Sequence, residues 1–283
     1  MSSSDPRVIL YHYNPNLPAA IVLAALFTLV TFYLSIQLFR YRAWFTLPLV
    51  TGGILEIAAY VCRSLSHNNT QSLGPYIIAS IFTLVAPAFV AATIYMILGR
   101  IIRLLDAAHL SPVRVTLLTK IFVIGDVFSF AVQSVGAQMQ TGKDVDKQKL
   151  GQKLIIGALF LQIFIFGLFV VVAGVFNWRI ARCPTQPAQG APWRKHMGAL
   201  YAASALIWVR NVVRTIEYIQ GSDGYIVGHE AFLYGFDAAP MFLVLVTMAL
   251  LYAPAFLRPR KPNSEEVEMQ RSGSGTDAVS EGA

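Results

Sequence analysis

Seven long apolar stretches run through this sequence, and they limit the folds open to it. Each has 18 or more residues, enough for a helix to cross a hydrocarbon core of about 30 Å, and they cover residues 17–39, 45–62, 76–98, 113–139, 154–178, 197–219 and 231–256. Backbone groups in hydrocarbon must be satisfied internally, and the stretches are too long and too continuously apolar for barrel strands. The sequence therefore predicts an all-α integral membrane protein, a seven-transmembrane-helix bundle.

The domain organisation follows from composition. Only 13% of the 283 residues are charged, against about a quarter in a typical soluble domain, and 55% are hydrophobic. We expect an extracellular N-terminal segment at 1–16, a membrane domain at 17–257 whose first span is retained rather than cleaved, and a disordered cytoplasmic tail at 258–283, which is polar and rich in small residues.

Lysine and arginine in the loops indicate the orientation. With the N-terminus outside and the C-terminus in the cytoplasm, the cytoplasmic segments carry 13 of these residues and the opposite side carries six. Four lysines between the fourth and fifth stretches argue the other way. Asn68 begins a glycosylation sequon in a loop that this topology places outside, which adds light support. We attribute the net charge of +7 to these cytoplasmic loops and expect no nucleic-acid partner.

The strongest pointer to function is a stripe of charge on the sixth stretch. Arg210, Arg214 and Glu217 are spaced by four and three residues, which places them on one helix face. A charge inside a bilayer costs several kcal/mol, by estimates of about 3 or more, so these side chains must face partners or water inside the bundle.

Three further stretches carry the same kind of polar stripe. We predict that their members join the charged stripe in binding or translocating a substrate, which gives ten candidate site residues: Glu56, Arg63, Asp126, Gln133, Arg210, Arg214, Glu217, Glu230, Tyr234 and Asp237. Most of them lie toward the expected outer side, so we expect a polar cavity open to that side. The alternative is that the same groups neutralise one another as a structural lock.

Several functional classes lack their motifs. The sequence has no Gly-rich phosphate loop, no His-Glu-x-x-His and no paired-cysteine metal pattern, so we expect no cofactor and no metal. The last stretch has no lysine, which removes a retinal Schiff base. Pro87, with small residues on both sides, predicts a kink and close helix packing in the third stretch.

Taken together, these residues resemble the fungal lipid-translocating exporter family. The resemblance spans all seven stretches, and its elements in order are Tyr13-Asn14-Pro15, Glu56-x-x-x-Tyr60-x-x-Arg63, Ala86-Pro87, Tyr95-x-x-Leu98-Gly99-Arg100, Asp126-x-x-Ser129-x-x-x-Gln133-x-x-Gly136, Gly157 with Gln162, Arg210-x-x-x-Arg214-x-x-Glu217, and Gly221, Gly224 and Glu230-x-x-x-Tyr234-x-Phe236-Asp237.

The resemblance implies a non-enzymatic fungal protein of the plasma membrane or an endomembrane. Its implied activity is the export of sphingoid long-chain bases, phospholipids or sterol-like toxic compounds, giving lipid or drug resistance, with membrane lipids as partners. Two alternatives stay open: a terpene-cyclase-like membrane enzyme using Glu56 with Asp126 or Asp237, and a seven-helix stress receptor. A homo-oligomer and a cytoplasmic partner for the tail are also compatible with the sequence.

Overall fold

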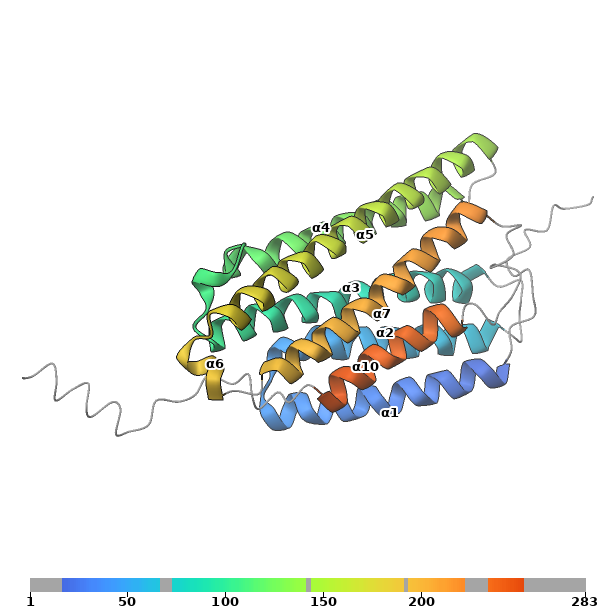
Figure 1. Cartoon of the computed structure of the whole chain (residues 1–283). Helices are drawn as coiled ribbons and strands as arrows, with labels where there is room; N and C mark the ends of the chain where they lie inside the picture. Colours follow the sequence, from blue (N-terminus) through green and yellow to red (C-terminus); the bar gives the residue numbers. More distant parts are fainter. Residues whose placement is uncertain (1–16, 67–72, 141–143, 191–192, 222–233, 252–283) are drawn as a thin grey trace, which may run out of the picture.

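The computed structural model describes residues 17–66, 73–140, 144–190, 193–221 and 234–251. Its long helices pack side by side as a bundle (Figure 1). They are α1 (Leu17–Tyr41), α2 (Leu47–Ser66), α3 (Leu73–Leu104), α4 (Val115–Gln140), α5 (Val145–Arg182), α7 (Trp193–Gln220) and α10 (Ala239–Leu251), the last preceded by the π-helical turn η3 (Tyr234–Ala238). Short elements lie between them: η1 (Trp44–Thr46), η2 (Ala108–Leu110) and α6 (Gln186–Gly190).

Each of the seven predicted stretches overlaps one of the long helices, and the chain is a multi-pass membrane protein. Within the described residues, α1 to α5 are long and apolar enough to cross a membrane, and residues 234–250 form a shorter apolar helix. α7 has the length for a span, but its charged and polar side chains lower its hydropathy. The orientation stays a prediction. Asn68, Glu230, the segment 1–16 and the tail 258–283 lie outside the described residues.

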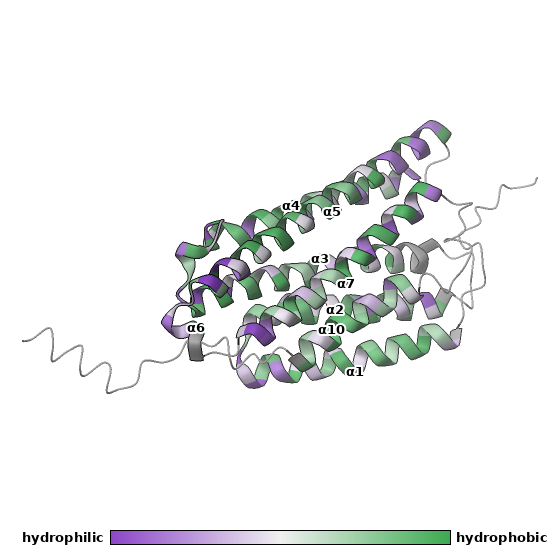
Figure 2. Ribbon diagram, viewed as in Figure 1, coloured by the Kyte–Doolittle hydropathy of each residue, from purple (hydrophilic) through white to green (hydrophobic). Residues whose placement is uncertain are grey.

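The exposed faces of the bundle are strongly apolar. Large side chains such as Leu29 and Phe32 on α1, Ile124 on α4 and Phe164 on α5 are more than 60% exposed. Hydrophobic residues cover most of the ribbons, whereas hydrophilic ones gather near several helix ends and along parts of α7 (Figure 2). Such a surface suits contact with lipid tails rather than with water.

The core is centred on α3, which packs against α2, α4 and α7. Ile94, Leu98 and Ile101 of α3 are completely buried. Tyr95 lies between aromatic rings of two neighbouring helices, with its ring centroid 4.6 Å from that of Phe169. This arrangement holds the two halves of the bundle together around one helix.

Small residues bring the helices close together, as the sequence predicts around Pro87. A Cβ built on Gly52 of α2 would lie 3.1 Å from the carbonyl oxygen of Ala86 on α3. A Cβ built on Gly136 of α4 would lie 2.7 Å from the carbonyl oxygen of Gly151 on α5. A methyl group at Gly136 would clash with the facing backbone, and one at Gly52 would be in unusually tight contact with it, so the small residues allow this close approach.

α5 is longer than its apolar stretch. It begins at Val145, nine residues before the predicted span, because the Asp144 side chain caps it by accepting the Asp146 N–H at 3.1 Å. Lys147, Lys149 and Lys153 therefore lie on a helix rather than in a loop between α4 and α5.

Candidate functional site

A buried ion pair joins α7 to the start of the last helix. Arg210 Nη2 lies 2.6 Å from Asp237 Oδ1, and both side chains are almost fully enclosed. Asp237 belongs to η3, the π-helical turn directly before Pro240. Short π-helical turns are often found at functional sites.

Arg210 has a second partner that the sequence explains. Its Nη2 donates a hydrogen bond to the carbonyl oxygen of Thr83 on α3, at 2.9 Å. Pro87 has no N–H, so the carbonyl four residues earlier, that of Thr83, loses its helical donor. The arginine satisfies this oxygen and links α3, α7 and η3.

Arg214 and Glu217 pair along α7. Arg214 Nη1 lies 2.9 Å from Glu217 Oε2 and 3.2 Å from Oε1, and Arg214 Nε lies 3.7 Å from Asp237 Oδ1. The two arginines thus approach the same carboxylate from successive turns of α7. This geometry confirms the single helix face that the spacing predicts.

Glu56 lies beside these pairs without forming one. It is 1% exposed and interacts electrostatically with Asp237, Arg210 and Arg214. Glu56 forms no ion pair with any described residue, and its Oε1 has no hydrogen-bond partner there. We call Glu56, Arg210, Arg214, Glu217 and Asp237 the charged cluster.

Asp126 and Gln133 lie in a different polar group, between α3, α4 and α5. The hydroxyl of Tyr95 donates to Asp126 Oδ2 at 2.8 Å, and the Gln133 amide donates to Gln162 Oε1 at 3.0 Å. Among the described residues, neither Asp126 nor Gln133 forms a hydrogen bond or ion pair with the charged cluster. The candidate residues therefore divide into a charged cluster and a hydrogen-bonded group, which we call the Asp126 group (Tyr95, Asp126, Gln133 and Gln162).

The remaining candidates are peripheral or lie outside the described residues. Arg63 and Tyr234 are half-buried. Arg63 interacts electrostatically with Tyr60. Tyr60 also interacts electrostatically with Glu56, Asp237 and Arg210. Glu230 lies outside the described residues.

Three partners were missed by reasoning from charge alone: Thr83, Tyr95 and Gln162. Tyr95 and Gln162 belong to the motifs that resemble the exporter family, so those motifs could have indicated both residues. Thr83 contributes only its backbone oxygen, and the signal for it is Pro87 four residues later.

The charged cluster is closed in this conformation. Glu56, Arg214 and Asp237 are all buried, so the predicted outward-open cavity would require the helices to move. Within the part of the chain that the structure describes, no three His, Cys, Asp or Glu side chains are grouped to hold a metal ion. What the cluster offers is fixed positive charge beside a carboxylate that has no direct partner among the described residues, a combination that can accept a cationic or an anionic headgroup.

Comparison with known proteins identifies the family of the chain. The family model described as RTA1 like protein matches residues 49–260. The chain is 34% identical to Protoporphyrin uptake protein 1 of Saccharomyces cerevisiae, covering 88% of this chain and 94% of that protein. It is 34% identical to Protein RTA1 of the same species, covering 95% and 92% of the two chains.

More distant similarity extends to a sphingoid base transporter. Sphingoid long-chain base transporter RSB1 of Saccharomyces cerevisiae is 24% identical, over 86% of this chain and 72% of that protein. No solved structure matches the chain. The resemblance seen in the motifs is confirmed: the chain belongs to the RTA1-like family of lipid-translocating exporters.

Proposed function

We propose that this protein translocates amphipathic lipids across a membrane without catalysing a chemical reaction, and that the charged cluster holds the polar headgroup during transfer. The observation that carries the proposal is Glu56, a fully buried carboxylate with no direct partner among the described residues. An unpaired carboxylate in a bilayer is costly, so it must be protonated or meet a cation. The ammonium group of a sphingoid base would supply that cation.

The relatives support a cargo of this class. They include a sphingoid long-chain base transporter, a probable lipid transporter and a protoporphyrin uptake protein. These cargoes all combine a large apolar body with a polar or ionisable group. A cluster with both arginines and carboxylates suits such a range, because moving a polar group through hydrocarbon requires a substitute for its hydration shell.

Within this proposal the two polar groups have different roles. The charged cluster binds the headgroup, with Arg210 and Arg214 free to exchange carboxylate partners for an anionic cargo. The Asp126 group, whose hydrogen bonds are made between helices, keeps α3, α4 and α5 in register. Arg63 and Tyr234 border the charged cluster and would contact the cargo on its way in or out.

The experiment is a transfer assay in liposomes that hold the purified full chain. A fluorescent sphingoid base, a fluorescent glycerophospholipid and protoporphyrin are added on one side, and their arrival on the other side is followed with time. We expect the wild-type protein to accelerate transfer of the sphingoid base. Glu56→Gln should lower that rate at least about tenfold, as expected when one charge-assisted contact of roughly 1.5 kcal/mol or more is lost.

The matched control is Asp146→Asn, which makes the same acid-to-amide change at an exposed position on α5. It should transfer lipid at the wild-type rate. Absence of stimulated transfer of any cargo by monodisperse protein would overturn the proposal, and so would equal rates for Glu56→Gln and wild type. Conversion of a substrate in detergent, where no membrane separates two compartments, would favour the enzyme alternative.

A further inference from the structure

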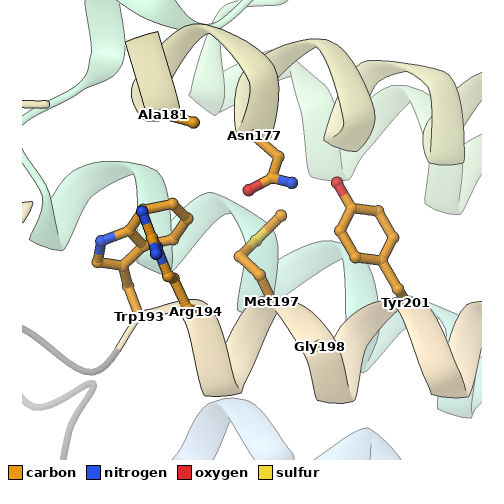
Figure 3. Close-up of a pocket in the computed structure, with 7 residues that line it drawn as sticks. All are labelled: Asn177, Ala181, Trp193, Arg194, Met197, Gly198 and Tyr201. Carbon is orange, nitrogen blue, oxygen red and sulfur yellow. The ribbon is translucent and has the colours of Figure 1, made fainter. Parts of the chain in front are cut away.

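A groove separate from the charged cluster runs between α5 and α7. It consists of two adjoining pockets, of about 350 Å³ and about 490 Å³, that share Tyr201. The first pocket includes Asn177 of α5 and Arg194 of α7, and Arg194 lies alongside the ring of Trp193 (Figure 3). None of the residues that line either pocket belongs to the charged cluster.

The spacing of the lining residues makes the two pockets one continuous groove. On α5 they include Gly167, Val170 and Asn177, and on α7 they include Arg194, Tyr201 and Trp208. Intervals of three and seven residues keep each set on one helix face. The distance along α7 from Arg194 to Trp208 is about 21 Å at 1.5 Å per residue, or roughly two-thirds of a hydrocarbon core.

One end of the groove is apolar and unfilled. The larger pocket is lined by Gly167, Val170, Ala205 and Trp208, with the single hydroxyl groups of Ser204 and Tyr201. A Cβ built on Gly167 would meet nothing within 4 Å. Trp208 is 45% exposed, so this end opens sideways toward the lipid rather than toward the core. An apolar chain fits this space.

The other end is positively charged and polar. Arg194 is exposed, its guanidinium lies 5.7 Å from the ring of Trp193, and it forms no ion pair with a described residue. Arg182 is the last residue of α5, at the same end of the helix pair as Arg194. Its guanidinium lies 4.0 Å from the centroid of the Trp178 ring. Neither the last two turns of α5 nor the first two turns of α7 contain an acid. The charge therefore complements an anion.

Polar side chains from both helices line this end. The Tyr201 hydroxyl donates to the carbonyl oxygen of Ala173 at 2.9 Å, which fixes the ring at the junction of the pockets, and the Asn177 amide lines the same pocket as Arg194. A guanidinium is the preferred protein group for a phosphate, and tryptophan is enriched where headgroups meet the hydrocarbon.

We infer that the groove between α5 and α7 binds one acidic phospholipid, with its phosphate at Arg194 and Asn177 and an acyl chain along Tyr201, Ala205 and Trp208. This lipid is distinct from the transported cargo proposed above, because its site shares no residue with the charged cluster. Its binding can be measured without transport, so the two proposals fail independently.

The test is native mass spectrometry of the purified full chain in detergent, titrated with phosphatidylglycerol or with phosphatidylcholine of the same acyl chains. We expect one phosphatidylglycerol to be retained at least about fivefold more than phosphatidylcholine. Arg194→Gln should abolish that preference, whereas Lys195→Gln, the same loss of charge on the next exposed residue, should retain it. Inorganic phosphate at millimolar concentration should not displace the lipid, because it lacks the acyl chain.

A second pair of variants tests the apolar end. Gly167→Leu should fill the larger pocket and lower phosphatidylglycerol retention at least about fivefold. Gly157→Leu, at an exposed glycine of the same helix that also has open space around it, should retain the lipid as wild type does. Equal retention of the two lipids by wild type, unchanged preference in Arg194→Gln, or displacement by inorganic phosphate would overturn the inference. If Gly167→Leu does not elute as a monodisperse species, the comparison of Arg194→Gln with Lys195→Gln decides the test.

Discussion

Arg210 Nη2 donates to the carbonyl oxygen of Thr83 at 2.9 Å, the oxygen that Pro87 deprives of its helical donor. The same nitrogen lies 2.6 Å from Asp237 Oδ1. One guanidinium therefore compensates a proline-induced defect in α3 and neutralises a carboxylate on η3. The two roles can be separated by substitution.

The first prediction concerns the link between Arg210 and Pro87. In Arg210→Ala the Thr83 carbonyl loses its described donor, and Pro87→Ala supplies a new N–H four residues later. We expect the double variant to be more stable than the sum of the single changes predicts, by about 0.5–1 kcal/mol, the worth of a hydrogen bond inside a bundle. Thermal unfolding in detergent measures this. Pro48→Ala, in the first turn of α2, should show no coupling to Arg210→Ala.

The second prediction concerns the Arg210–Asp237 pair. Removing either partner leaves a buried charge, and Arg210→Leu or Asp237→Leu should each cost about 3–5 kcal/mol. The double leucine variant should recover much of this loss, because an apolar pair avoids the desolvation penalty. Lys147→Ala breaks an exposed pair at 3.6 Å and should cost less than about 1 kcal/mol. Single leucine variants as stable as Lys147→Ala would refute the prediction.

Much of this architecture could be predicted from the sequence. The length and apolarity of seven stretches indicated the helices, because hydrocarbon leaves the backbone few other solutions. The spacing of Arg210, Arg214 and Glu217 correctly placed them on one face. The pairing between helices could not be predicted in this way, because spacing says which face a residue is on but not which helix that face meets.

Asp126 illustrates this limit. In the sequence it resembles Glu56, since each is an acid within an apolar stretch and belongs to a polar stripe. The structure places Asp126 against Tyr95 of α3 and Glu56 beside Arg210 of α7. Which helix lies next to which is set by long-range packing, such as the close approach at Gly52 and Ala86, and no local pattern encodes it.

The third prediction concerns exchanging the charges of Arg214 and Glu217. A simple pair on one helix would tolerate Arg214→Glu with Glu217→Arg. Here Arg214 Nε also lies 3.7 Å from Asp237 Oδ1, so a glutamate at 214 would face a second carboxylate. We expect the exchanged protein to melt at a lower temperature than the neutral variant with glutamine at both positions. An exchanged protein as stable as wild type would show that the charge at position 214 has no appreciable electrostatic interaction with Asp237.

The fourth prediction concerns the contact between α4 and α5. A Cβ at Gly136 would lie 2.7 Å from the carbonyl oxygen of Gly151, so Gly136→Ala must push two backbones apart. Overpacking of this kind costs about 1–3 kcal/mol. Gly157→Ala, where the added methyl group meets open space, should be neutral or stabilise by up to about 1 kcal/mol. The comparison of the two melting temperatures tests the packing directly.

The last prediction separates the Asp126 group from the charged cluster. Tyr95→Phe removes the only hydrogen bond described for Asp126, leaving a buried acid without that donor, and should cost about 1–3 kcal/mol. Asp126→Asn keeps an oxygen that accepts from the Tyr95 hydroxyl, so it should fold with a loss below about 1 kcal/mol. If Asp126 only holds helices together, Asp126→Asn should also move lipid in liposomes at the wild-type rate, in contrast to Glu56→Gln. A stable Asp126→Asn protein that moves no lipid would instead make Asp126 part of the transport path, because a protonatable acid would then be needed where an amide of the same shape does not suffice.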